Sequence, residues 1–188
     1  MANRIIVPKN KIETNGEPVI FLAGPVSCAG GWQNDAIRIL GSNDYRAYIA
    51  VPDYDRILSP VYIDGSEKSS KPFQYQLEWE QHYLEIAENN GAILFWLPQQ
   101  VIETTVDQKT RFHRTYARDT RPETGGWGWG LLRCRQNAHV AIGGENGFDG
   151  IDVIKRNFAR YAHHIPFRDK LEDVCADALR FTKASILV

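Results

Sequence analysis

The sequence predicts an α/β fold in which helices flank a doubly wound, mainly parallel sheet of five strands. Short apolar runs end at glycine, proline or polar residues, segments of helical length lie between them, and this alternation recurs along the chain. The 188 residues suffice for one domain with a sizeable core, and no linker or internal repeat divides them. We therefore expect one domain over residues 1–188, with 1–17 as an N-terminal extension.

The first elements follow from local patterns of apolar residues and turn residues. Residues 18–23 form an apolar run that ends at Gly24-Pro25, which is typical of a buried strand followed by a turn. A helix is expected over 32–40, where apolar residues recur on one side and a glycine follows. Residues 45–51 predict the second strand, which a proline ends.

Two long polar segments flank the next helix and strand. Residues 53–72 show little periodicity and predict a loop. A helix is then expected over 73–90, and a strand over 92–97 is so apolar that both of its faces should be covered, as in the centre of a parallel sheet. The polar stretch 98–122 predicts another long loop, and loops of this length are commonly functional.

The second half of the chain continues the alternation. Its expected elements are the end of a helix at 131–136, a fourth strand at 139–142, a turn at 143–147, a helix at 151–161, a short fifth strand at 164–167 and a closing amphipathic helix at 171–183.

Composition excludes several classes of function. The net charge is −1, so no overall basic field would recruit a nucleic acid polymer. No apolar run is long enough for a membrane span or a signal peptide. The three cysteines are widely spaced, which fits a reduced cytoplasmic protein and argues against a zinc site. We expect a cytoplasmic protein without metal or membrane partner.

The most informative stretch surrounds Glu123. The sequence Thr120-Arg-Pro-Glu123-Thr-Gly125 follows the long polar loop and precedes a tryptophan- and glycine-rich run over 126–130. In an open α/β sheet the loops at the carboxyl ends of the strands form the ligand crevice. A glutamate there is ionised at neutral pH and can act as a nucleophile without a separate base. The alternative is an acid at a helix N-terminus, which the helix dipole favours.

Five segments in a fixed order resemble the nucleoside 2-deoxyribosyltransferase family and its close N-glycosidase relatives. They are Phe21-Leu-Ala-Gly-Pro25 with Trp32-Gln-Asn34; Val51-Pro52 with Asp53-Tyr-Asp-Arg56; Gln76-Leu-Glu-Trp-Glu80 leading to Ile93-Leu-Phe-Trp-Leu-Pro98; Thr120-x-x-Glu123-x-Gly125; and His139-Val-Ala-Ile-Gly143 with Ile151-Asp-Val153. No single segment is specific, and the resemblance depends on their order and spacing over residues 18 to about 160.

The resemblance implies a flavodoxin-like sheet, no cofactor, and a glutamate that attacks the anomeric carbon of a nucleoside or nucleotide. Glu123 matches the position of that nucleophile. Cleavage of an N-glycosidic bond passes through an oxocarbenium-like state, and retaining glycosidases stabilise such a state with a pair of carboxylates. A nucleobase as acceptor would make the protein a transferase and water would make it a hydrolase. A catalytically silent nucleotide-binding module remains a third interpretation.

Glu80 is the candidate for the second carboxylate. It follows Trp79 in the part of the helix that resembles the family, and the alternative is an ordinary solvated helix glutamate. The family often has an aspartate just before its central strand, where this chain has Glu88-Asn-Asn-Gly91. The chain departs from the family's pattern at this position.

Residues Asp53, Asp55 and Arg56 fall on the loop where the family holds the nucleobase. Their polar groups could bind the edge of a base, and the Arg56 guanidinium could bind a phosphate. The alternative is a solvated Asp/Arg ion pair, which contributes little.

The remaining candidates also have structural alternatives. Gly24 and Pro25 could bring backbone close to a ligand or could simply form a tight turn. Trp32 and Trp127 are candidates for stacking on a base, although large aromatic residues more often pack in cores and interfaces. Relatives are usually homo-oligomers, so Asp152 is a candidate to reach a neighbouring subunit's pocket. Its plain role is an acid in the first turn of a helix.

Overall fold

A computed structural model describes residues 4–8, 11–25, 29, 31–42, 47–52, 70–100, 124–130 and 138–184, with the backbone only at 70–75, 129, 183 and 184. The strands are β1 (Arg4–Ile6), β2 (Val19–Ala23), β3 (Tyr48–Ala50), β4 (Gly91–Leu97), β5 (Val140–Gly144) and β6 (Phe167–Arg168). The helices are α1 (Trp32–Gly41), α3 (Ser70–Asn89), α6 (Ile151–Tyr161) and α7 (Leu171–Ala184), with an irregular helical segment η2 (Thr124–Gly130).

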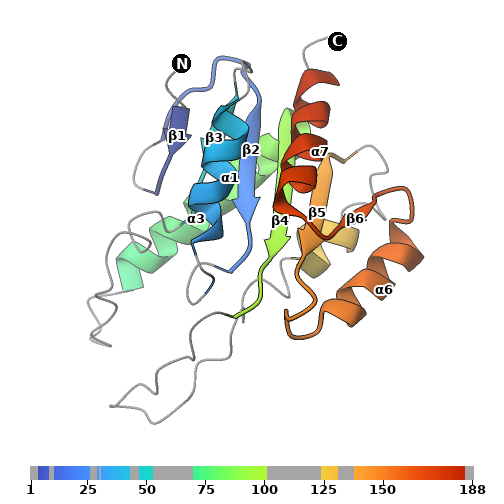
Figure 1. Cartoon of the computed structure of the whole chain (residues 1–188). Coiled ribbons are helices and arrows are strands. Elements are labelled where there is room, and N and C mark those ends of the chain that lie inside the picture. Colours follow the sequence, from blue (N-terminus) through green and yellow to red (C-terminus); the bar gives the residue numbers. More distant parts are fainter. Residues whose placement is uncertain are drawn as a thin grey trace.

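The fold is α/β, with one six-stranded, all-parallel sheet in the order β1-β3-β2-β4-β5-β6. Helices α1 and α7 cover one face of the sheet, and α3 and η2 cover the other (Figure 1). Helix α7 packs on β4 and β5, α3 packs on β2 and β4, and α6 packs against η2. This is a flavodoxin-like, doubly wound arrangement, which confirms the predicted fold class.

The centre of the sheet is buried on both sides. Every residue of β2, β4 and β5 is buried, as the nearly continuous apolar runs of these strands predict. The helix predicted over 151–161 has these bounds in the structure. Helices α1 and α7 lie within one residue of their predicted ends.

The sheet has six strands where the sequence predicts five. The additional strand, β1, lies in the region 1–17 that was expected to be an N-terminal extension. It is only three residues long, so it carries no alternating pattern that could be detected. Pairing with β3 and an ion pair between Arg4 and Glu17 hold it at the edge of the sheet.

Two element boundaries differ from the prediction because of proline. Helix α3 begins at Ser70 rather than at residue 73, with Pro72 in its first turn, where backbone N–H groups have no partner within the helix. Strand β6 covers Phe167 and Arg168 rather than 164–167. Pro166 has no N–H to donate to a neighbouring strand and therefore precedes β6.

A buried carboxylate joins α7 to β6. Asp177 is 5% exposed and accepts hydrogen bonds from Arg168, at 2.7 Å from Nε and 3.2 Å from Nη2. Arg180, one turn further along α7, also pairs with Asp177. The two guanidinium groups compensate the buried charge.

None of the helices in the described parts of the chain is long and apolar enough to cross a membrane.

Close packing behind β5 generates the first prediction. A Cβ atom on Gly143 would lie 2.5 Å from both the Arg168 carbonyl oxygen and Val174 Cγ2. We expect Gly143→Ala to lower the free energy of unfolding by about 1–3 kcal/mol, because β6 or α7 must move. Gly126→Ala is the matched control, since no atom lies within 4 Å of its added Cβ. Urea denaturation measures both, and equal stabilities would contradict this packing.

The Cys175 thiol generates the second prediction. Burial, assisted by the negative charge of Glu172, raises the pKa of this thiol from 9.0 to about 12. The thiolate fraction at pH 8 is then lower by roughly 1000-fold than for an ordinary thiol. In a Cys28→Ser/Cys134→Ser variant, a chromogenic disulfide reagent should therefore label the folded protein very slowly and the denatured protein quickly. Rapid labelling of the folded protein would contradict the burial.

Candidate functional site

The strand order defines where a ligand crevice lies. After β2 the chain passes to β3 on one side, and it then returns across β2 to form β4 on the other. The carboxyl ends of β2 and β4 therefore form the topological switch point, beside which ligands bind in open α/β sheets. This part of the sheet edge is the candidate site.

The loop that leaves β2 is held at this edge by Trp32. The indole Nε1 donates a hydrogen bond of 2.7 Å to the Pro25 carbonyl oxygen, and the Trp32 side chain is 4% exposed. A Cβ on Gly24 would lie 2.3 Å from the Trp96 carbonyl oxygen in β4. The sequence therefore located Gly24, Pro25 and Trp32 correctly at the strand exit. Their described contacts are with one another and with β4, and stacking of Trp32 on a base stays a prediction.

The loops that leave β4 and β5 are joined by Glu145. Its backbone N–H donates to the Leu97 carbonyl oxygen at 3.0 Å, and its carboxylate accepts a 2.7 Å hydrogen bond from the Gln99 backbone N–H. Sequence reasoning missed this residue. The available signal was an acid directly after a glycine-terminated apolar strand, in the predicted turn at 143–147.

Helix α3 carries the predicted second carboxylate across the opposite face of β2 and β4. Trp79 is fully buried and contacts Phe21 of β2, with 6.2 Å between ring centroids. The next residue, Glu80, is half-buried, and its Oε1 accepts a 2.7 Å hydrogen bond from Gln76 Nε2. Because α3 runs opposite to the parallel strands, side chains that lean toward its N-terminus lean toward the carboxyl edge of the sheet.

The segment η2 is packed against the same face as α3. Thr124 is fully buried, and Trp127 is partly buried and packs against the core. A Cβ on Gly128 would lie 3.0 Å from a Phe158 ring carbon and 3.9 Å from Phe95, so the backbone here is close to two aromatic rings. The glycine-rich run therefore packs closely against β4 and α6. Trp127 is partly buried against core residues there.

Four predicted residues, Glu123, Asp53, Asp55 and Arg56, lie outside the described residues. Asp152 is in the first turn of α6 and is exposed, which is the plain position expected for a first-turn acid. Within the described parts of the chain, neither Asp152 nor Trp127 forms a hydrogen bond with Glu80. The structure therefore groups Gly24, Pro25 and Trp32 at one strand exit and gives Glu80, Trp127 and Asp152 separate positions on other elements.

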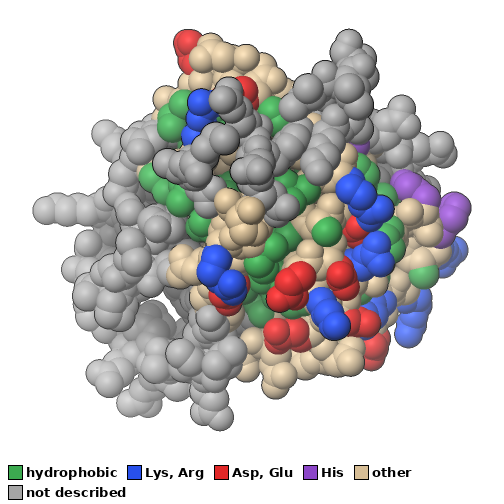
Figure 2. Space-filling model, turned by 45° about the horizontal axis from the view of Figure 1, so that its top comes forward, with side chains coloured by type: hydrophobic (Ala, Val, Ile, Leu, Met, Phe, Trp, Pro, Cys, Tyr) green, Lys and Arg blue, Asp and Glu red, His purple; other side chains and the backbone are tan. Residues whose placement is uncertain are grey.

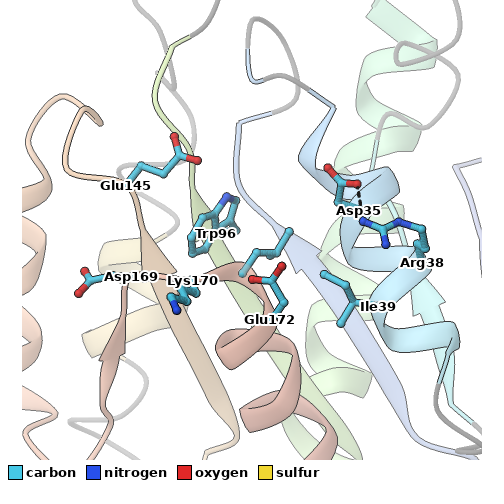
Figure 3. A pocket seen from close by; sticks show the side chains of 9 residues that line it. Asp35, Arg38, Ile39, Trp96, Glu145, Asp169, Lys170 and Glu172 are labelled. Atoms are coloured by element: carbon cyan, nitrogen blue, oxygen red, sulfur yellow. Dashed lines mark hydrogen bonds and ion pairs between the residues drawn. The ribbon is translucent and has the colours of Figure 1, made fainter.

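An open pocket of about 370 Å³ lies beside the switch point on the face covered by α1 and α7 (Figure 3). None of its lining residues was predicted as a site residue. They are Asp35, Arg38, Ile39, Trp96, Glu145, Asp169, Lys170, Leu171 and Glu172. Figure 2 shows acidic and basic side chains mixed in one region of the visible surface, with hydrophobic side chains between them.

The charged groups of this pocket are largely solvated. Asp35 pairs with Arg38 at 3.1 Å, and their side chains are 57% and 74% exposed. Asp169 pairs with Lys155 at 3.3 Å and is 74% exposed. Exposed pairs of this kind are worth little in free energy. The pocket is therefore a shallow polar surface rather than a desolvated reaction site.

Over the ranges that the structure describes, no group of three or more His, Cys, Asp or Glu residues could hold a metal ion. Comparison of the sequence with protein-family models and with curated proteins finds no match.

The Trp32 hydrogen bond generates the third prediction. Trp32→Phe keeps a ring in the buried position but leaves the Pro25 carbonyl oxygen without its donor, which should lower the free energy of unfolding by about 1–3 kcal/mol. Trp127→Phe is the comparison, because the indole of Trp127 makes no hydrogen bond among the described residues. Chemical denaturation followed by circular dichroism measures both variants. A Trp32→Phe variant as stable as the parent would contradict a structural role for this bond.

Proposed function

We propose that this protein cleaves the N-glycosidic bond of a deoxynucleoside or nucleotide and transfers the sugar to another nucleobase. The nucleophile is Glu123 and the second carboxylate is Glu80. The observation that carries the proposal is the half-buried Glu80 carboxylate, which α3 holds above β2 and β4, the two strands that form the switch point. The order of motifs around Glu123 supports the same reaction.

The chemistry requires two displacements at one carbon. In the first, a carboxylate oxygen of Glu123 bonds to the anomeric carbon while the bond from that carbon to the base nitrogen breaks. The electron pair leaves with the base, which takes a proton, and a glycosyl ester remains on the protein. In the second, a nitrogen of an incoming base bonds to the same carbon, loses its proton and releases the Glu123 carboxylate. Water in place of the base gives hydrolysis.

Glu80 suits the role of proton carrier. Its carboxylate is half-buried on the helix that covers β2 and β4, and it accepts a hydrogen bond from the Gln76 side-chain amide. A carboxyl group in such surroundings can give a proton to the departing base and take one from the acceptor.

A second subunit is part of the proposal. Val153 on α6 is 56% exposed, although it is a large apolar residue, and it lies beside the exposed Asp152. A homo-oligomer would cover Val153 and bring Asp152 to a neighbouring site, which sedimentation analysis at assay concentration would detect.

The fourth prediction concerns the two carboxylates. Glu123→Gln should lower the rate of base release by roughly 1000-fold or more, because an amide is a poor nucleophile. Glu80→Gln should lower it by about 100-fold, as expected for loss of a general acid–base group. Glu78→Gln, which changes an exposed glutamate two residues away on the same helix, should keep the parent rate.

Chromatography of a deoxynucleoside panel, with and without a free acceptor base, gives these rates and identifies the reaction. A new nucleoside that forms only with acceptor establishes transfer, and free base without acceptor establishes hydrolysis. The monophosphates form a second panel. Ligand-induced stabilisation without product from either panel would contradict the proposal and would identify a binding module instead.

A further inference from the structure

We infer that Gln76 is a positioning residue, which orients the Glu80 carboxylate for proton transfer. This inference rests on the proposed function, because it assigns a role within that site. It adds a residue for which the sequence alone gave no function. Gln76 and Glu80 lie four residues apart on α3, so their side chains lie on the same face of the helix.

The backbone that carries Glu80 is fixed independently of this pair. Trp79 packs on Phe21 of β2 and on Tyr83, with ring centroids 6.2 and 4.9 Å apart. The Tyr83 hydroxyl in turn accepts a 2.9 Å hydrogen bond from the Ile12 backbone N–H. The rotation of α3 about its axis is therefore set by buried aromatic contacts. These contacts fix the helix backbone, and the Glu80 side chain has torsions of its own.

The contact with Gln76 acts on the Glu80 side chain itself. The last torsion of a glutamate side chain has a broad distribution, so packing alone does not define the plane of its carboxylate. Gln76 Nε2 donates a 2.7 Å hydrogen bond to Glu80 Oε1, and both side chains are half-buried. A hydrogen bond to a carboxylate in such partly desolvated surroundings is stronger than one in water. Gln76 therefore orients the group through an uncharged amide.

The position of Phe21 relates this pair to the candidate site. Phe21 is two residues before the end of β2, so Trp79 lies within roughly 7 Å of the carboxyl edge along the strand direction. Gln76 is almost one turn closer to the N-terminus of α3, which is the end of the helix nearer that edge. The hydrogen bond therefore holds Glu80 toward the switch point.

The same helix contains a matched control pair. Gln81 Nε2 and Glu85 Oε1 have the same residue types at the same spacing, but they are 3.5 Å apart and both side chains are exposed. If Gln76 affects kcat only by stabilising the helix, Gln81 should have the same effect. If Gln76 acts by orienting Glu80, Gln81 should have no effect on kcat.

The test is steady-state kinetics of base release by the full chain. Gln76→Met keeps the length of the side chain and removes the donor. It should lower kcat about tenfold, less than loss of Glu80 itself, with KM within about twofold of the parent. Gln81→Met should leave both constants at the parent values. Thermal unfolding of each variant is measured alongside, and the assay temperature is kept well below every midpoint.

A double variant, Gln76→Glu/Glu80→Gln, separates orientation from stability. It exchanges the two groups, so the helix retains one amide–carboxylate hydrogen bond but carries the carboxylate at position 76. We expect its melting temperature to match the parent and its kcat to match Glu80→Gln alone. Parent-like kcat in the double variant would overturn the inference, because the position of the carboxylate would then be unimportant.

Different results would overturn the role of Gln76 and the proposed function. An active parent with Gln76→Met and Gln81→Met equally active would overturn the role of Gln76 and leave the proposed function intact. A fall in kcat that disappears after correction for the folded fraction would also overturn it. A folded parent that releases no base from any nucleoside or nucleotide would overturn the proposed function and this inference together.

Discussion

The parallel pairing of β2 with β4 is the constraint on which the candidate site depends. The pair runs in register from Val19 opposite Gly91 to Ala23 opposite Phe95, and both strands are buried throughout. It begins with a close approach, since a Cβ on Gly91 would lie 1.8 Å from the Val19 carbonyl oxygen. Helix α7 packs on this pair from one face and α3 from the other. The switch point, and hence the crevice at its carboxyl edge, exists because β3 pairs on the far side of β2.

Two kinds of carboxylate occur around this edge, and their surroundings suit different roles. Asp35 and Asp169 are mostly exposed and pair with basic side chains in solvent, where charge interactions are weak. Glu80 is half-buried on the opposite face and accepts a hydrogen bond from Gln76. Electrostatic and proton-transfer effects are larger where water is partly excluded. This difference, rather than the number of acids, favours the α3 face as the reacting side.

The sequence predicted those parts of the molecule that depend on local pattern. The apolar runs of β2 and β4 and the stop signal after α1 predicted these elements to within one residue, and turn residues located Gly24 and Pro25 at a strand exit. The three-residue β1 was missed because it is defined by pairing with β3. The links made by Glu145 and by Gln76 were missed for a related reason. Both links depend on side-chain geometry in the folded chain. In the sequence, Gln76 and Gln81 each precede a glutamate by four residues, so spacing alone does not distinguish the two glutamines.

The most direct test of the central claim is to trap the glycosyl ester. A 2-fluoro-substituted deoxynucleoside slows the breakdown of such an ester by destabilising the oxocarbenium-like state. The protein would be incubated with this substrate, digested and analysed by mass spectrometry. We expect one fluorinated sugar per chain, on the peptide that contains Glu123. Turnover of ordinary nucleosides with no adduct, or an adduct at another residue, would contradict it.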